Sequence, residues 1–227
     1  MTGALARLVA RLVARPSARL PGRVLVRPLP WLLVGLLLTA CASTGHGSTS
    51  SGATGGVGSA HVDVDTPALR AAKEQAHVET CRPGTGGSDL PRRTLPCLGG
   101  GPSVDLAHLS GPLVINLFAQ WCGPCRSEMP YYQQLHEKAR GTLRVLGVDY
   151  LDPQPDRALG LVKATGVTYP LLADPDGTLR PDFGVKGLPG LVMVAADGKV
   201  TVQFRVVRSY AELRTAVQQV LHVSIPA

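Results

Sequence analysis

Two cysteines in one short segment have the residue types and spacing for redox chemistry. Residues 121–125 read WCGPC, so Cys122 and Cys125 are separated by two residues. At the start of a helix, two cysteines at this spacing lie within one turn and can form a reversible disulfide. The free N–H groups and the positive end of the helix dipole stabilise a thiolate there and lower its pKa. We therefore predict an exposed Cys122 as the nucleophile and Cys125 as the thiol that resolves the mixed disulfide.

The same spacing could instead supply half of a zinc site. A zinc ribbon needs a second pair of ligands at comparable spacing. Cys81 and Cys97 have fifteen residues between them, and the six histidines are scattered along the chain and predicted to be solvated. The sequence therefore predicts no metal and no other cofactor, because the redox-active disulfide itself carries the electrons.

The pattern of apolar residues places the WCGPC segment between a strand and a helix. Residues 113–118 form a short continuous apolar run, which is typical of a central buried strand. Residues 123–139 have a helical pattern, with a kink expected at Pro130. A second buried strand is predicted at 143–148 and a helix at 156–165. The motif therefore lies in a strand–helix–strand–helix unit.

The C-terminal part adds a hairpin and a last helix. Residues 171–173 are predicted to be a short edge segment. The Asp197-Gly198 turn joins predicted strands at 191–195 and 199–207. A helix is predicted at 209–221, opened by a capping box. Together these elements predict an α/β fold with a central mixed β-sheet sandwiched by helices.

One stretch of the chain resembles a known family. From residue 113 to 130 the sequence LVINLFAQWCGPCRSEMP strongly resembles the TlpA/ResA-like branch of thioredoxin-fold proteins, and the resemblance covers about residues 88–222. Members are bacterial proteins that face the extracytoplasmic side and exchange thiols with disulfides. Many of them reduce the haem-binding cysteines of apocytochrome c. The resemblance implies a thioredoxin fold, client proteins with thiols or disulfides, and a membrane thiol protein as electron donor.

The resemblance also implies roles for residues around the cysteine pair. Glu128 matches an acid that tunes the Cys125 proton or takes part in substrate recognition, and an exposed acid of the first helical turn is the alternative. Pro189 matches a cis-proline that faces the cysteines and helps hold an extended substrate, with an ordinary loop proline as the alternative. Trp121 would shield the disulfide, and Pro124 would shape the helix start.

One position supports this branch over cytosolic thioredoxin, and another departs from the family's pattern. Asn116 stands where thioredoxin has a buried aspartate in the strand before the cysteines, which favours the TlpA/ResA-like branch. Gly190 follows Pro189 where the family commonly has threonine. We expect the loss of this side chain beside the substrate groove to change the choice of partner.

The first 40 residues have the features of an export signal. They hold six of the 23 basic residues and no acid, and they end in an apolar run at 31–40. This run is half as long as the roughly 20 residues that a membrane-spanning helix needs. The tetrad LTAC at 38–41 resembles the bacterial lipoprotein signal, in which the cysteine is lipidated. We predict lipidation of Cys41 and anchoring on the extracytoplasmic side of the bacterial cell membrane. An ordinary secretory cleavage site and a transit peptide stay open as alternatives.

Composition then divides the chain into four segments. Residues 1–40 are the predicted lipoprotein signal peptide, and 41–62 are a flexible membrane tether rich in Ser, Gly and Thr. Residues 63–98 form an N-terminal extension with a helix predicted at 66–79. The thioredoxin-like domain follows at 99–227.

Two further cysteines, Cys81 and Cys97, remain to be assigned. An oxidising compartment favours their pairing. A bridge between them would add about 3 kcal/mol in the loop-entropy model and would pin the extension near the start of the sheet. We interpret the pair as a structural disulfide. A second redox pair that relays electrons, and free thiols, stay open as alternatives.

Charge and motifs narrow the class of function. Basic and acidic residues nearly balance outside the N-terminal segment, and no basic patch interleaved with aromatics is present, which excludes nucleic-acid binding. Gly-Pro between the cysteines resembles reducing thioredoxins, so we predict a reductase, with cytochrome c maturation implied by the resemblance alone. An oxidase that forms disulfides in secreted proteins is the alternative. A peroxiredoxin-like peroxidase and a copper-binding carrier also stay open, although the sequence lacks the Pro-x-x-x-Thr-x-x-Cys surround of the first and the cysteine spacing of the second.

Overall fold

A computed structural model describes residues 61–227, which belong to one compact unit. The predicted signal peptide, Cys41 and nearly all of the predicted tether lie outside the described residues. Within 61–227, no helix has the length and apolar character needed to cross a membrane.

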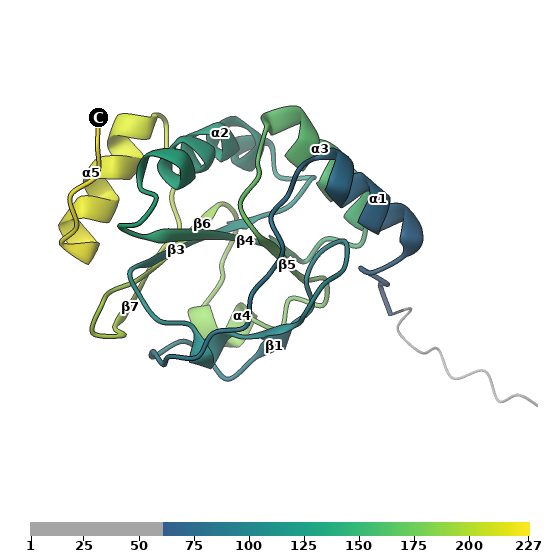
Figure 1. Ribbon diagram of the computed structural model, residues 1–227, viewed down its shortest axis with the longest axis horizontal. Helices are drawn as coiled ribbons and strands as arrows, with labels where there is room; N and C mark the ends of the chain where they lie inside the picture. Colours follow the sequence, from purple (N-terminus) through teal and green to yellow (C-terminus); the bar gives the residue numbers. More distant parts are fainter. Residues whose placement is uncertain (1–60) are drawn as a thin grey trace, which may run out of the picture. The chain divides into compact units, whose positions relative to one another are not determined.

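A five-stranded mixed sheet forms the centre of this unit, with strand order β5-β4-β3-β6-β7 (Figure 1). The neighbouring strands β3, β4 and β5 run parallel, whereas β6 is antiparallel to both β3 and β7. The strands are β3 (Leu113–Phe118), β4 (Arg144–Tyr150), β5 (Leu171–Asp174), β6 (Gly190–Val194) and β7 (Val200–Gln203). All six residues of β3 are buried, because this strand is the middle one and is covered on both faces.

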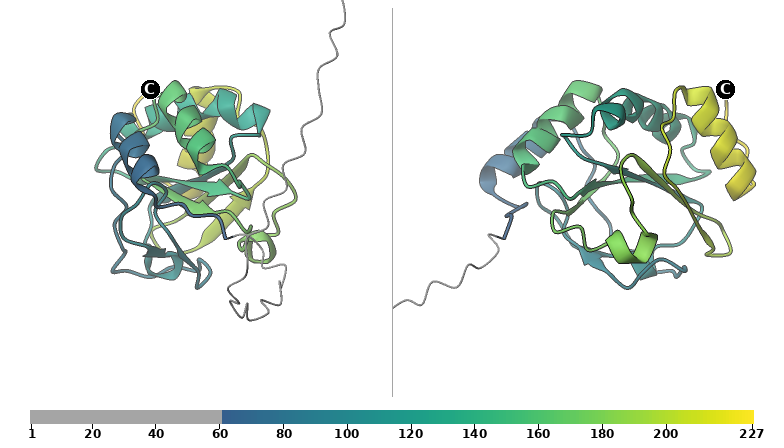
Figure 2. Two further views of the ribbon diagram at one scale, coloured as in Figure 1. Left: turned by 90° about the vertical axis from the view of Figure 1, so that its right-hand side faces the viewer. Right: turned by 180° about the vertical axis from the view of Figure 1, so that it is seen from behind.

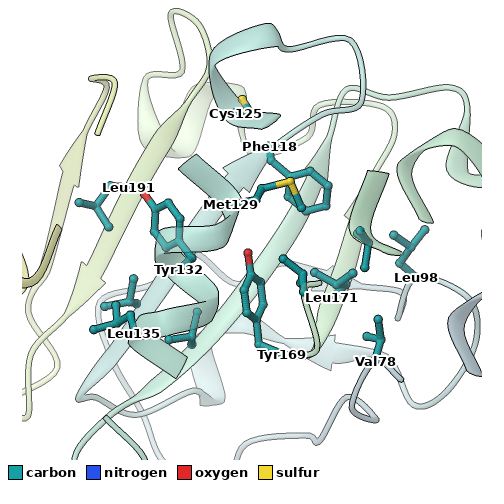
Figure 3. Packing of buried hydrophobic residues seen from close by; sticks show 14 of the residues in the cluster. Val78, Leu98, Phe118, Cys125, Met129, Tyr132, Leu135, Tyr169, Leu171 and Leu191 are labelled. Atoms are coloured by element: carbon teal, nitrogen blue, oxygen red, sulfur yellow. The ribbon is translucent and has the colours of Figure 1, made fainter. Parts of the chain in front are cut away.

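Different layers cover the two faces of the sheet (Figures 1 and 2). Four helices lie over one face: α1 (Pro67–Gln75), α2 (Gly123–Lys138), α3 (Pro155–Thr165) and α5 (Tyr210–Leu221). The other face carries the antiparallel pair β1 (Thr94–Leu95) and β2 (Val104–Asp105), the 3-10 helix η1 (Leu106–His108) and the short helix α4 (Arg180–Phe183). A hydrophobic cluster fills the space on each face, and Figure 3 shows part of the one beneath α2.

Most of the predicted elements are present, with shifted ends. The central strand and the start of α2 lie where the sequence predicts them, and α2 ends one residue early. The helix predicted at 66–79 is wrong in length, because α1 ends at Gln75 and the chain turns at His77, where φ is +55°. Neither the β1–β2 pair nor α4 was predicted, since elements of two to four residues are too short to show a hydrophobic period.

The cap of α5 differs in one detail from the predicted capping box. The Ser209 hydroxyl accepts a hydrogen bond from the Glu212 N–H at 3.1 Å, as expected. The Glu212 carboxylate, however, accepts from the N–H of Arg208 at 2.9 Å, one residue before the cap. The last helix is therefore fixed to the segment that precedes it, and Val207 of this segment contacts Glu128 of α2.

The N-terminal extension covers the outer edge of the sheet. Residues 96–98 lie along β5, because the Leu98 N–H donates to the Leu171 carbonyl and the Ala173 N–H donates to the Pro96 carbonyl, both at 2.9 Å. Cys97 lies in this added segment and forms a disulfide with Cys81. The segment satisfies backbone groups that an edge strand would otherwise expose.

Candidate active site

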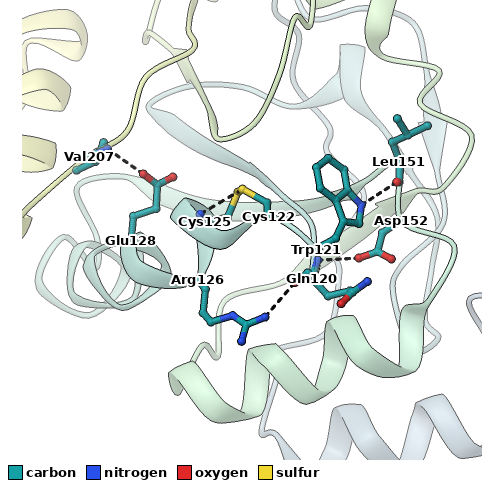
Figure 4. Close-up of a disulfide and its surroundings, with 9 residues drawn as sticks. All are labelled: Gln120, Trp121, Cys122, Cys125, Arg126, Glu128, Leu151, Asp152 and Val207. Carbon is teal, nitrogen blue, oxygen red and sulfur yellow. Dashed lines mark hydrogen bonds between the residues drawn. A yellow bond between two sulfur atoms is a disulfide. The ribbon is translucent and has the colours of Figure 1, made fainter.

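The end of β3 and the start of α2 together position the first cysteine pair (Figure 4). Cys122 is the N-cap residue of α2, and Gly123 and Pro124 form its first two positions. Cys122 and Cys125 are joined by a disulfide with a Cα–Cα distance of 5.3 Å. The backbone N–H of Cys125 points at Sγ of Cys122, 3.2 Å away. This N–H is one of the unpaired donors at the helix start, so it would stabilise a thiolate on Cys122.

The two sulfurs of this pair differ in their access to solvent. Cys122 is 4% exposed and Cys125 is 0% exposed, and Cys125 packs in the cluster that contains Phe118 and Met129 (Figure 3). The prediction of an exposed Cys122 is therefore wrong for the disulfide form, because its side chain turns inward to bond Cys125. Of the two cysteines, only Cys122 is exposed to solvent at all, so an incoming thiolate reaches its sulfur first.

Glu128 lies one turn beyond Cys125 and is fully buried, which contradicts the alternative of an exposed helix acid. One carboxylate oxygen accepts a hydrogen bond from the Val207 N–H at 2.9 Å, and the other has no partner among the described residues (Figure 4). Burial raises the pKa of Glu128 from 4.5 to about 7, the Val207 hydrogen bond opposes the rise, and the charge of Glu212 adds to it. This carboxyl group therefore exchanges its proton near neutral pH.

Other buried polar side chains continue from Glu128 between α2 and the sheet. Asn116 donates from its amide nitrogen to the Tyr169 hydroxyl at 3.2 Å. Burial raises the pKa of both Tyr132 and Tyr169, and the neighbouring Glu128 charge raises both further. The phenols of Tyr132 and Tyr169 thus stay protonated. Of these three side chains, Glu128 is the one that can release a proton at neutral pH.

Hydrogen bonds from two sides fix the loop that carries Trp121. The indole Nε1 donates to the Leu151 carbonyl at 3.1 Å, and the N–H of Gln120 donates to the Asp152 carboxylate at 2.7 Å (Figure 4). Arg126 donates to the Gln120 carbonyl at 3.2 Å. Trp121 is 52% exposed beside the cysteines, so its ring offers an apolar surface to a partner.

A buried acid next to this loop was not predicted. Asp149 is 2% exposed at the end of β4. Burial raises its pKa well above the ordinary value, and the neighbouring carboxylate of Asp152 raises it further. The only available signal was an aspartate inside an otherwise apolar run, three residues before another aspartate.

The Leu188–Pro189 peptide bond is cis. The antiparallel register pairs Gly190 with Leu117, so Pro189 comes next to the end of β3 that leads into the cysteine loop. A Cβ atom on Gly190 would lie 3.0–3.2 Å from three side-chain atoms of Leu117. The Leu117 side chain thus fills the space that a larger residue at position 190 would need, and the expected change in the choice of partner stays a prediction.

The remaining predicted site residues lie elsewhere. Cys81 and Cys97 belong to the hydrophobic cluster on the other face of the sheet from Cys122 and Cys125. His136 is not solvated as predicted: its side chain is 11% exposed, and it bonds Glu79 at 3.0 Å. Across residues 61–227 no group of three potential metal ligands comes together.

Comparison with known proteins shows the family of this chain. A family model described as the AhpC/TSA family matches residues 87–203, slightly more than half of the chain. The chain belongs to this family. It is 37% identical over 101 residues to the thiol:disulfide interchange protein CycY of Rhizobium leguminosarum bv. viciae, covering 44% of this chain and 53% of that protein. The Escherichia coli K12 thiol:disulfide interchange protein DsbE is 36% identical over 103 residues, covering 45% and 52%. The chain thus spans about half the length of these curated relatives.

Solved structures of this family's relatives have the same fold. MTB dsbF matches with a TM-score of 0.52 at 27% identity, covering 57% of this chain and 98% of that one. A secreted thiol-disulfide isomerase from Corynebacterium glutamicum matches with a TM-score of 0.51 at 26% identity, covering 59% and 85%. The predicted thioredoxin fold and the predicted similarity to bacterial thiol:disulfide interchange proteins are confirmed.

Proposed function

We propose that the chain exchanges the dithiol and disulfide forms of Cys122 and Cys125 with thiols and disulfides of client proteins. The observation that carries this proposal is the position of Cys122 as N-cap of α2, with a backbone N–H aimed at its sulfur. The Cys122 thiolate attacks one client sulfur, and the other client sulfur leaves with the electron pair. Cys125 then attacks Cys122, and the client is released with both thiols.

Glu128 is the group to which we assign the proton that Cys125 loses in the second step. Residues three apart on a helix are neighbours on its surface, and Glu128 follows Cys125 by three. Its pKa of about 7 makes it a base above neutral pH and an acid below it. Catalysis needs no further cofactor in this scheme, because electrons enter and leave through the cysteines.

The direction that we propose is reduction of client disulfides, with apocytochrome c as a client. The Gly-Pro pair between the cysteines and the family resemblance support this direction, and the names of CycY and DsbE support thiol:disulfide interchange. Cis-Pro189, beside the end of β3, is the residue that we propose to hold the client strand. A membrane thiol protein would return electrons to the oxidised pair.

We further propose that lipidated Cys41 anchors the chain on the extracytoplasmic side of the cell membrane. The LTAC tetrad and the basic, acid-free segment before it support this location. The mass of the N-terminal peptide from membranes tests it: a diacylglyceryl group on Cys41 is expected, and an unmodified N-terminus at another residue would contradict it.

The equilibrium reduction potential of the Cys122–Cys125 pair tests the direction. The full chain is equilibrated in thiol–disulfide buffers, alkylated, and analysed peptide by peptide so that each cysteine pair is scored separately. A reductase is expected to have a value near that of thioredoxin, about −270 mV. A value near −120 mV would instead support the oxidase that forms disulfides in secreted proteins. Retention of exchange activity in Cys122→Ser would refute the proposed chemistry altogether.

A further inference from the structure

A buried lysine lies against the second disulfide. Lys73, on α1, is 7% exposed, and its Nζ lies 3.0 Å from Sγ of Cys97 and 2.7 Å from the Gly100 carbonyl oxygen. Cys97 and Cys81 are each 1% exposed. The ammonium group is therefore enclosed together with one end of the S–S bond.

The surroundings leave this ammonium group poorly compensated. Within residues 61–227, no carboxylate oxygen lies within 4.0 Å of Lys73 Nζ, and the nearby Asp65 is paired with Arg70 at 2.6 Å. Burial lowers the pKa of Lys73, and the charge of Asp65 only partly opposes this. A disulfide sulfur is a weak acceptor, whereas a thiolate in the same place would carry a full negative charge. A bridge that served only as a cross-link would gain nothing from a buried cation at one sulfur.

We propose that Cys81–Cys97 is a second redox-active disulfide, in which Cys97 becomes a thiolate paired with the ammonium group of Lys73. The assignment does not depend on the function proposed for the first pair. Stabilising the reduced form in this way makes a disulfide easier to reduce. The fitting substrate is a dithiol that approaches as a thiolate.

The exchange step has a defined direction. A thiolate of the external dithiol attacks Sγ of Cys81, and the S–S bond breaks with its electron pair passing to Sγ of Cys97. The second thiol of the donor loses its proton to solvent and attacks the donor sulfur of the mixed disulfide. Cys81 leaves and takes up a proton, so the donor ends as a disulfide and the pair as one thiol and one thiolate.

The approach that we assign to this attack is a groove next to the chain segment that carries the buried Cys81. It has a volume of about 370 Å³, and its lining includes both neighbours of Cys81 in the chain, Thr80 and Arg82. Arg140 and Arg144 also line it, opposed by the single acid Glu79. This excess of positive charge attracts a thiolate, and the apolar floor accommodates its carbon skeleton.

A turn of three glycines, Gly99 to Gly101, covers the Cys97 side. All three have positive φ values, from +70° to +121°. A Cβ atom on exposed Gly101 would lie 3.4 Å from Sγ of Cys97 and 3.8 Å from Nζ of Lys73. Exposed Gly101, which has no side chain, therefore lies close to both the sulfur and the lysine.

The test compares Lys73→Met with the matched control Lys199→Met in the full chain, since the Lys199 side chain is 80% exposed on the β6–β7 hairpin. Each protein is equilibrated in a series of thiol–disulfide buffers and alkylated, and the redox state of each cysteine pair is read by peptide mass spectrometry. In Lys73→Met, the reduced-to-oxidised ratio of Cys81–Cys97 at fixed buffer should fall about tenfold or more. The Cys122–Cys125 ratio, and both ratios in the control, should not change. An unchanged Cys81–Cys97 ratio would overturn the proposal.

A second measurement needs no variant and so does not depend on the folding of Lys73→Met. In the reduced wild-type chain, the pH dependence of alkylation at Cys97 gives the pKa of its thiol. We expect a midpoint below the ordinary value of about 8.5 and native circular dichroism. A midpoint at or above 8.5, or unfolding on reduction of Cys81–Cys97, would show a structural bridge and overturn the proposal.

Discussion

Replacement of Glu128 by glutamine should remove a pH dependence of stability whose size follows from the burial of this side chain. The pKa of Glu128 is about 7 in the folded chain against 4.5 without burial. Between these values the folded chain keeps a proton that the unfolded chain has released. Stability is therefore highest below pH 4.5, falls as the pH rises, and becomes level above about pH 7. At about 1.4 kcal/mol per pKa unit, the total loss is about 3 kcal/mol.

The assay is the free energy of unfolding in urea for the oxidised wild-type chain and Glu128→Gln, each measured between pH 4.5 and 8. Because the glutamine does not titrate, the stability of Glu128→Gln relative to wild type should rise by about 3 kcal/mol across this range. Glu74→Gln, at an exposed position of α1, controls for the loss of one carboxylate from the surface. Parallel curves for wild type and Glu128→Gln would refute the reasoning, since they would mean that burial does not perturb this group.

Three further substitutions test other parts of the site. Asp149→Asn should be more stable than wild type at pH 7–8, because burial raises the pKa of Asp149 and its ionisation opposes folding. This stability difference should shrink towards pH 4, and thermal melts at the two pH values measure it. Gly190→Thr should cost about 1–3 kcal/mol in urea unfolding through crowding of Leu117, and Leu117→Ala in the same chain should recover part of the loss. Cys125→Ser should accumulate a mixed disulfide between Cys122 and a client, whereas Cys122→Ser should form none, and a non-reducing gel measures this. Equal trapping by both variants would show that Cys122 is not the nucleophile.

The part of the site that lies close together in the chain could be predicted. Residues 113–118 are an apolar run, broken only by Asn116, that is typical of a buried strand, and the WCGPC segment follows after two residues. The positions of β3, the loop and the start of α2 could therefore be predicted from the local pattern. The position of Pro189 opposite this loop came from resemblance, since nothing in the residues 187–190 alone shows where β6 pairs.

Features that depend on distant contacts could not be predicted. The spacing places Glu128 one turn after Cys125, but its burial depends on Val207, 79 residues later in the chain. Lys73 is one of several charged residues in an Ala-rich helix, and its contact with Cys97 requires that residues 96–98 pair along β5. Side-chain type specifies neither contact, because both arise only when the sheet edge and the C-terminal segment are in place.

The two disulfides are arranged alike, but the side chains beside Cys125 and Cys97 have opposite charges. In each proposed pair one sulfur takes the attack, Cys122 or Cys81, and the other lies towards a buried ionisable side chain. Ionised Glu128 disfavours a second negative charge near Cys125 and so destabilises the reduced form of that pair. The ammonium group of Lys73 favours a thiolate on Cys97 and so stabilises the reduced form of the other pair. On these two assignments, electrons would pass from the Cys122–Cys125 dithiol of one molecule to the Cys81–Cys97 disulfide of another, and not in the reverse direction.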